Sequence, residues 1–212
     1  MQTRGRFITF EGIDGSGKTT QMRMLAERLR REGREVLEAV EPGGTPVGAQ
    51  IRRILLDSAN QDLRPTTELL LYFASRAQNV EQCILPALSA GKIVLCDRFT
   101  DSTLAYQGFA RGLGEDTVLA LDQIACHGLN PDLTLLVDLD LETGLARTQA
   151  RNAGITASET RMDDQSIEFH RKVRTAYFDL AKKYAGRFRV IDGRGTPESV
   201  AARVWESVAA YV

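Results

Sequence analysis

The sequence has few cysteines and histidines and no long hydrophobic run. The three cysteines (Cys83, Cys96 and Cys126) are odd in number and widely spaced, which argues against a disulfide framework and against a zinc site. We expect them to be reduced thiols of a cytoplasmic protein. The apolar run near the N-terminus is broken by Glu11 and is too short for a signal peptide or a membrane span. No membrane partner is therefore expected.

An excess of charge of one sign is also missing. The 27 lysines and arginines nearly balance 28 aspartates and glutamates, which leaves a formal net charge of -1. Proteins that bind nucleic acids or anionic membranes are usually basic, so neither partner is expected. A chain of 212 residues with 43% hydrophobic and 26% charged residues is typical of a soluble globular protein. We predict a single domain over residues 1–212.

A phosphate-binding motif lies near the N-terminus. Gly12, Gly17, Lys18 and Thr19 match the P-loop pattern G-x-x-x-x-G-K-[ST], between a short apolar strand and an amphipathic helix. Its glycines allow the backbone amides to approach phosphate, and the following helix directs its positive dipole end to the same anion. Lys18 supplies a cation for the outer phosphates, and the Thr19 hydroxyl can bind Mg²⁺. The predicted ATP-binding residues are Gly12, Asp14, Gly15, Ser16, Gly17, Lys18, Thr19 and Thr20.

Strand-like and helix-like segments alternate along the whole chain. This order predicts an α/β fold with a five-stranded parallel sheet flanked by helices, in which the P-loop strand is central. Apolar runs place the strands at 6–11, 35–40, 93–97, 133–138 and 188–191. Helical periodicity predicts helices at 17–31, 47–56, 101–107, 116–126, 141–150 and 165–184, a long one from Pro65 to Gly91 with a kink near Pro86, and a last one from Pro197.

The carboxyl end of the third strand carries a second group of polar residues. Asp97 ends that strand and can hold the water shell of Mg²⁺, while Arg98 can bind a second phosphate. A surface ion pair that caps the next helix is the alternative interpretation. Phe73 and Arg76 are one helical turn apart, so the pair can stack on a base and bind its edge. Phe73 as plain core is the competing interpretation there.

These residues carry a resemblance to a known family. The chain resembles bacterial thymidylate kinases along nearly its whole length. The matching stretches are Phe10-Glu-Gly-Ile-Asp-Gly-Ser-Gly-Lys-Thr-Thr20, Glu41-Pro-Gly-Gly-Thr45, Leu71-Tyr-Phe-Ala-Ser-Arg76, Asp97-Arg-Phe99, Ser102-Thr-Leu-Ala-Tyr-Gln-Gly108, Pro131-Asp-Leu-Thr-Leu and Leu-Val-Asp138. The P-loop alone is generic, whereas the turn Asp97-Arg98 with the residues that follow it is specific to this family.

The resemblance implies a three-layer P-loop kinase fold and transfer of the ATP γ-phosphoryl group to dTMP, which gives dTDP for dTTP synthesis and DNA replication. It implies that Arg52 and Arg98 hold the dTMP phosphate, that Phe73 stacks on thymine and that Arg76 binds the base. Tyr106 should exclude ribonucleotides. The full set of residues implied for dTMP is Asp14, Glu41, Pro42, Arg52, Phe73, Arg76, Arg98, Ser102, Thr103, Tyr106 and Gln107. Mg²⁺, held by Thr19 and through water by Asp97, and a homodimer are implied as well.

The P-loop is short of positive charge for phosphoryl transfer. Its variable positions, 13–16, contain no arginine or lysine, and Asp14 adds a negative charge. The polar stretch at 147–164 carries Arg147, Arg151 and Arg161 without an apolar pattern. We expect this stretch to form a short lid that delivers a catalytic arginine, Arg151 first, as in the bacterial type of the resembled family. A solvated charged loop is the alternative. The predicted catalytic residues are Lys18, Asp14, Arg98, Arg151, Arg147 and Arg161.

Two other functions are compatible with a P-loop. A related kinase would share Lys18 and Asp97 but need a different acceptor, which is another nucleoside monophosphate or a deoxynucleoside. A GTP-dependent switch would use a D-x-x-G motif, and Asp192-Gly-Arg-Gly195 has that spelling, but the chain has no N-K-x-D motif. His127 and His170 have no partner in the sequence for metal binding or catalysis. Transfer between phosphates needs no strong general base, so neither is assigned a role.

Overall fold

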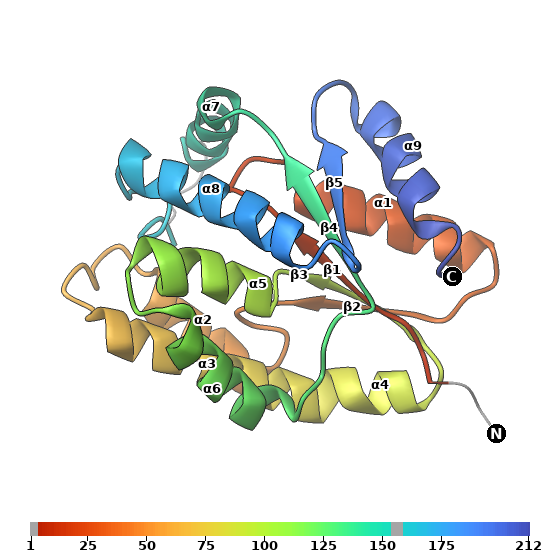
Figure 1. Ribbon diagram of the computed structural model, residues 1–212, viewed down its shortest axis with the longest axis horizontal. Coiled ribbons are helices and arrows are strands. Elements are labelled where there is room, and N and C mark those ends of the chain that lie inside the picture. The colour runs from red at the N-terminus through yellow and green to blue at the C-terminus, as the bar shows by residue number, and fades with distance from the viewer. Residues whose placement is uncertain (1–3, 154–158) are drawn as a thin grey trace.

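The computed structural model describes residues 4–153 and 159–212. Its centre is a parallel sheet with the strand order β2-β3-β1-β4-β5 (Figure 1). The predicted sheet and the central place of the P-loop strand are therefore confirmed. The strands are β1 (Phe7–Glu11), β2 (Val36–Val40), β3 (Ile93–Asp97), β4 (Leu133–Asp138) and β5 (Phe188–Asp192).

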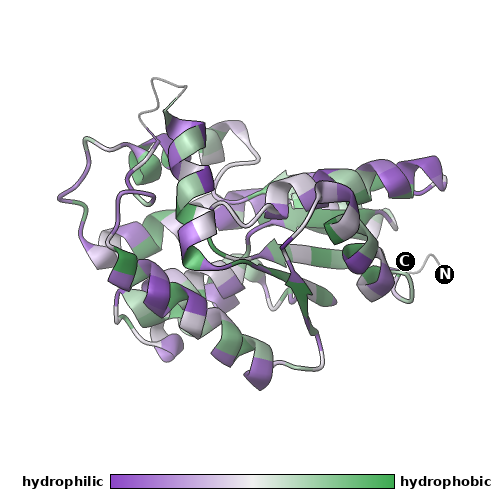
Figure 2. Cartoon of the chain, turned by 90° about the horizontal axis from the view of Figure 1, so that it is seen from above, coloured by the Kyte–Doolittle hydropathy of each residue, from purple (hydrophilic) through white to green (hydrophobic). Residues whose placement is uncertain are grey.

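Helices cover both faces of this sheet, so its three central strands are buried and largely apolar (Figure 2). Side chains alternate along β1: Ile8 and Phe10 pack with α1 (Lys18–Arg31) and α9 (Pro197–Val208). Phe7 belongs to the hydrophobic cluster on the opposite face, which includes residues of α8 (Ile167–Lys183) and α6 (Glu115–Cys126). This alternation also directs Glu11 to the second face, where its carboxylate accepts a hydrogen bond from the Tyr177 hydroxyl of α8.

Side-chain caps fix where several helices begin. Thr45 caps α2 (Pro46–Leu56), Asp140 caps α7 (Leu141–Asn152), Ser166 caps α8 and Thr196 caps α9. Each cap oxygen accepts a backbone N–H that the first helical turn leaves without a partner. Helix α9 begins at Pro197, so the predicted start of the last helix is confirmed. No helix within residues 4–153 and 159–212 combines the length and the apolar character needed to span a membrane.

The long helical segment after Pro65 is interrupted where the sequence predicted a kink. It consists of α3 (Pro65–Asn79), the π-helical turn η1 (Val80–Ile84) and α4 (Leu85–Ser89). Pro86 has no N–H to donate, and its ring would clash with the carbonyl of Gln82 in a regular α-helix. A wider π-turn just before the proline relieves this clash, and Leu85 N–H bonds to the Val80 carbonyl instead.

The segment after Arg98 differs from the predicted single helix at 101–107. A short helix, α5 (Thr100–Thr103), continues into a second π-helical segment, η2 (Leu104–Ala110). The wide turn is visible in the bond from Arg111 N–H to the Tyr106 carbonyl, which spans five residues. Single-residue propensities give no signal for a π-helix, so the sequence could not predict it.

Candidate active site

The P-loop connects β1 to α1 and depends on glycine at defined positions. Gly12, Gly15 and Gly17 all have positive φ, at 140°, 75° and 94°. A Cβ on Gly12 would lie 2.4 Å from the Val137 carbonyl oxygen, and one on Gly15 would lie 2.1 Å from that of Gly144. Both glycines are thus required by close backbone approaches as well as by conformation. The loop therefore packs closely between the end of β4 and helix α7.

Lys18 begins α1 and turns its ammonium group back over the loop. Its Nζ donates to the Ile13 carbonyl at 3.4 Å and lies 3.5 Å from Asp14 Oδ1. Burial lowers the pKa of Lys18, and the nearby Arg98 lowers it further, while Asp14 opposes both effects. A cation held there without a full set of partners is suited to receive phosphate oxygens.

Thr19 and Asp97 form a site that fits Mg²⁺. The Thr19 hydroxyl donates to Asp97 Oδ2 across the space between α1 and the end of β3. Asp97 Oδ1 is buried and has no hydrogen-bond partner among the described residues. Buried carboxylate oxygens seldom remain without a partner, so this atom is available to the water shell of a cation. Mg²⁺ usually binds through one or two such protein oxygens, together with waters and substrate phosphates.

Arg98 follows Asp97 in a left-handed backbone conformation, with φ of 70°. Its guanidinium Nη2 lies 2.7 Å from Asp14 Oδ1, and its Nη1 donates to the Ser102 and Tyr177 hydroxyls. Burial would raise the pKa of Asp14, but Arg98 and then Lys18 outweigh it and hold that pKa well below its usual range. Asp14 and Lys18 of the P-loop and Arg98 after β3 are therefore charged neighbours.

A cavity of about 780 Å³ opens beside these residues at the carboxyl ends of the strands. In an open parallel sheet, ligands bind at this edge, next to the strand where the order reverses. Of the residues predicted for dTMP, the cavity is lined by Asp14, Glu41, Pro42, Arg52, Arg76, Arg98, Ser102, Thr103, Tyr106 and Gln107. The structure thus brings ten of these eleven positions together; Phe73 is the exception.

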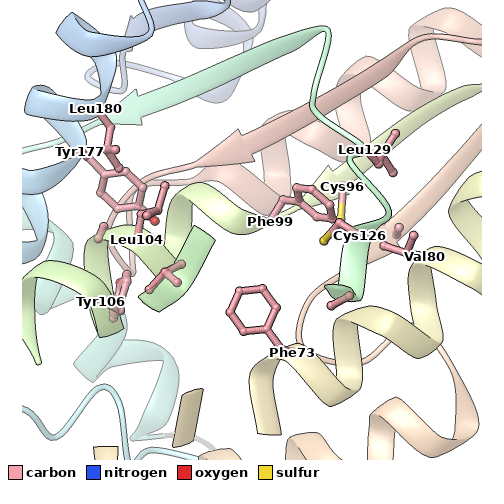
Figure 3. Packing of buried hydrophobic residues seen from close by; sticks show 14 of the residues in the cluster. Phe73, Val80, Cys96, Phe99, Leu104, Tyr106, Cys126, Leu129, Tyr177 and Leu180 are labelled. Atoms are coloured by element: carbon pink, nitrogen blue, oxygen red, sulfur yellow. The ribbon is translucent and has the colours of Figure 1, made fainter. Parts of the chain in front are cut away.

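Phe73 does not line this cavity, and Tyr72 occupies the expected place of an aromatic ring. Phe73 is 4% exposed and belongs to the hydrophobic core (Figure 3). The predicted stacking of Phe73 on a base is therefore wrong, and its competing interpretation as core is correct. The sequence could not separate the two rings by spacing, because positions three and four residues before Arg76 both lie near its helix face. Tyr72 is the residue that was missed.

Arg76 is held by a buried ion pair at the end of the cavity. Its Nε donates to Glu41 Oε2, and both side chains are almost completely buried. Asn79 Nδ2 donates to the other Glu41 oxygen at 3.2 Å, and Arg76 Nη1 reaches the Thr100 hydroxyl at 3.5 Å. Burial lowers the pKa of Arg76, but the Glu41 carboxylate outweighs it and raises that pKa above its usual value. The guanidinium group is thus fixed in place as a permanent donor.

Helix α5 and the π-helix η2 together form one wall of the cavity. Ser102, Thr103, Tyr106 and Gln107 all line the cavity. Ser102 and Tyr106 are four residues apart, as are Thr103 and Gln107, and residues at this spacing are neighbours on one helix face. The Tyr106 hydroxyl donates to Asp14 Oδ2 at 3.1 Å, and its ring lies 5.0 Å from the Arg98 guanidinium carbon. Tyr106 is thereby fixed between the P-loop and Arg98.

The three predicted lid arginines have different environments. Arg151 lines the cavity, has a side chain that is 54% exposed and pairs with Asp163 at 3.0 Å. Arg147 lies near the P-loop, with Nη1 3.5 Å from the Gly15 carbonyl oxygen. Arg161 is 2% exposed and pairs with Glu68 at 2.7 Å. The prediction that Arg161 is a mobile catalytic arginine is wrong, because the buried ion pair ties it to α3.

The predicted lid at 147–164 lies only partly within the structure. Helix α7 extends to Asn152, beyond its predicted end at 150, and residues 154–158 lie outside the described residues. At its other end, Arg161 N–H donates to the Leu56 carbonyl at 3.1 Å, and Glu159 pairs with Arg52 at 3.0 Å. Arg52, expected at the acceptor phosphate, is thus in contact with this segment. Met162 and Asp163 also line the cavity, and neither was predicted from the sequence.

Thr20 is exposed in the first turn of α1, and Ser16 is buried with its hydroxyl unpaired among the described residues.

His127 pairs with Glu81 at the surface, and His170 lies buried in α8. Neither histidine lines the cavity.

Comparison with known proteins identifies the family. The family model for thymidylate kinase matches residues 10–204. The chain belongs to the thymidylate kinase family. It is 51% identical to the thymidylate kinase of Geotalea uraniireducens (strain Rf4) over 200 residues, which is 93% of this chain and 94% of that protein. It is 53% identical to the thymidylate kinase of Geotalea daltonii over 191 residues, 89% of each chain.

A solved structure agrees with this assignment. The crystal structure of thymidylate kinase from Ehrlichia chaffeensis superposes with a TM-score of 0.79 at 34% identity, and the match covers 97% of this chain and 99% of that one. The resemblance inferred from the motifs is therefore confirmed, as is the P-loop kinase fold. The family match spans the P-loop, the turn at Asp97-Arg98 and η2, which are among the elements that surround the cavity.

Proposed function

We propose that this member of the thymidylate kinase family transfers the γ-phosphoryl group of ATP to dTMP and forms dTDP and ADP. The observation that carries the proposal is the cavity beside the P-loop, in which Arg98, Arg76 and Tyr106 converge from segments that the family match covers. The product would supply dTTP synthesis. Because the donor is ATP, we propose a cytoplasmic location, which agrees with the three free cysteines.

The residues suggest a division of labour. The P-loop and Lys18 would bind the ATP phosphates, and Thr19 and Asp97 would hold Mg²⁺, which neutralises charge between the phosphates when bound. Arg98 and Arg52 would hold the acceptor phosphate. Arg76 would donate to the base, and Tyr72 offers a ring on the cavity wall. Tyr106 would close the sugar pocket against a 2′-hydroxyl, and Arg151 would stabilise the migrating phosphoryl group.

A substrate panel tests this proposal. The protein is assayed with ATP, Mg²⁺ and dTMP, dUMP, dCMP, dGMP or thymidine as the acceptor. We expect the highest kcat/KM with dTMP, and Lys18→Ala should lower kcat by about 10²- to 10³-fold because it loses a contact made mainly in the transition state. A preference for another acceptor, or a folded Lys18→Ala variant with parental turnover, would contradict the proposal.

We also propose that the protein is a homodimer that uses the face of α2 and α3. Leu70 on α3 and Ile54 on α2 are 51% and 46% exposed, which is high for large apolar side chains. Light scattering coupled to size-exclusion chromatography should give twice the 23.4 kDa chain mass. Leu70→Glu should shift the mass toward the monomer, whereas the matched change Val190→Glu on β5, 50% exposed, should not. A parent that remains monomeric at micromolar concentration would contradict this part.

A further inference from the structure

Glu68, in the first turn of α3, is a buried carboxylate next to the cavity that the family motifs did not single out. It is 1% exposed and has partners from two distant segments. Arg161 Nη1 lies 2.7 Å from its Oε2, and Arg111 approaches both of its oxygens at 3.3 Å. Gln107 Nε2 donates to its Oε1 at 2.9 Å. Glu68 therefore connects η2, which forms a cavity wall, to the segment that follows residue 158.

The contact between Glu68 and Gln107 determines which end of the Gln107 amide faces the carboxylate. A carboxylate that pairs with two guanidinium groups is an acceptor and offers no hydrogen to a neighbour. Only the NH₂ end of the Gln107 amide can face the Glu68 carboxylate. The positions of the amide nitrogen and oxygen follow from this requirement for a donor. Gln107 lines the cavity, and no described residue donates a hydrogen bond to its Oε1. The amide oxygen is thus the free acceptor of this residue.

A free acceptor in the base region distinguishes pyrimidines by their N3 atom. Thymine carries a hydrogen on N3, whereas N3 of cytosine is an acceptor. We propose that Glu68 is a positioning residue that orients the Gln107 amide, so that its oxygen accepts from a base N3–H and rejects cytosine. This inference rests on the proposed function and adds to it the origin of the choice between bases. A site with a fixed polar atom rejects the wrong base because two acceptors would then face each other without a hydrogen.

A purely structural role for Glu68 makes a different prediction. If the carboxylate only anchors Arg161 and Arg111, its loss would lower stability and reduce activity with every pyrimidine by the same factor. If it orients Gln107, its loss would change the ratio of activities. The decisive quantity is therefore kcat/KM for dTMP divided by kcat/KM for dCMP, measured for each variant alongside its thermal unfolding.

The main variant is Glu68→Gln, which has nearly the same shape but can present either a donor or an acceptor to Gln107. The Gln107 amide can then rotate and offer its NH₂ group to cytosine N3. We expect the dTMP to dCMP ratio to fall about 10- to 100-fold, as for the loss of one buried hydrogen bond. Arg111→Gln is the matched control, because Arg111 bonds to the same carboxylate but not to Gln107. Its ratio should stay within about two-fold of the parent.

Two further variants keep the test decisive. If Glu68→Gln does not fold, the double variant Glu68→Met with Arg161→Met replaces the buried ion pair by apolar groups, which proteins often tolerate. Gln107→Met removes the amide itself and should lower the ratio at least as much. A parental ratio in a folded Glu68 variant or in Gln107→Met would overturn the inference. A parent that does not phosphorylate dTMP would instead overturn the proposed function.

Discussion

At the scale of single residues, the end of β3 shows how the site is kept in a costly conformation. Arg98 has a left-handed backbone, which costs a residue other than glycine roughly 1–2 kcal/mol. Arg98 N–H bonds to the Phe10 carbonyl at 3.0 Å, and Phe99 N–H bonds to Glu11 Oε1 at 2.8 Å. These bonds from β1 hold the turn in place. The strained residue thereby points its guanidinium group at Asp14 and the cavity, as strained residues at functional sites often do.

The buried carboxyl group of Glu11 makes the free energy of unfolding depend on pH. It is completely buried, and burial followed by repulsion from Asp101 raises its pKa from 4.5 to about 7. Between pH 4.5 and about 7, Glu11 therefore keeps its proton in the folded protein and has lost it in the unfolded chain. The free energy of unfolding should therefore fall as the pH rises from about 4.5 to 7, by up to about 3 kcal/mol from this group.

Urea unfolding at several pH values tests this expectation. Glu11→Gln cannot ionise, so its free energy of unfolding should lack this decline between pH 4.5 and 7. Glu38→Gln, a change in a half-buried glutamate of β2, serves as the control and should follow the parent. Parallel pH profiles for the parent and Glu11→Gln would show that Glu11 does not titrate in this range.

At the scale of elements, the segment from α7 to α8 separates a candidate catalytic arginine from an anchoring one. Arg151 is half exposed and held at the cavity by Asp163, whereas Arg161 is buried against Glu68 and Leu56. An arginine that stabilises a migrating phosphoryl group can contribute roughly 10³- to 10⁵-fold to the rate. We expect Arg151→Ala to lower the single-turnover rate of transfer to dTMP by about 10³-fold with little loss of stability.

Arg161→Ala should have the reverse profile. It leaves Glu68 with Arg111 as its remaining cation, so it should lower the free energy of unfolding by up to roughly 3–5 kcal/mol. Its single-turnover rate should fall less than that of Arg151→Ala, and Arg147→Ala should lie between them. Chemical quench and urea unfolding of the three variants give both quantities. Equal rate losses in all three, or a rate loss only in Arg161→Ala, would refute the division of roles.

The elements also show what the sequence could predict. Buried parallel strands are continuous apolar runs, and the P-loop has a fixed spacing, so both were predicted from local sequence. The environment of Arg161 depends on Glu68, which is 93 positions away, and the choice between Tyr72 and Phe73 depends on a helix rotation of one residue. The π-helix η2 likewise has no local signature. These features arise from packing between distant segments, so local patterns could not predict them.

At the scale of the whole molecule, the residues that line the cavity lie together at the edge of the sheet formed by the carboxyl ends of its strands. The P-loop follows the central strand β1, Arg98 follows β3, and Glu41 follows β2, so parallel strands bring all three to one side. The cavity lies between that edge and residues from α2, α3, η2 and the segment around Arg151. In the function that we propose, the donor and acceptor sites would share Lys18, Asp14 and Arg98, which are neighbours at this edge. This arrangement is suited to direct transfer between two bound phosphates and not to hydrolysis.

The most direct test follows the γ-phosphate itself. ATP labelled on that phosphate is mixed with Mg²⁺ and excess protein, with and without dTMP, and the products are separated after a single turnover. Our account predicts label in dTDP when dTMP is present and only slow release of inorganic phosphate when it is absent. Release of inorganic phosphate at the same rate in both mixtures, with no labelled dTDP, would contradict it.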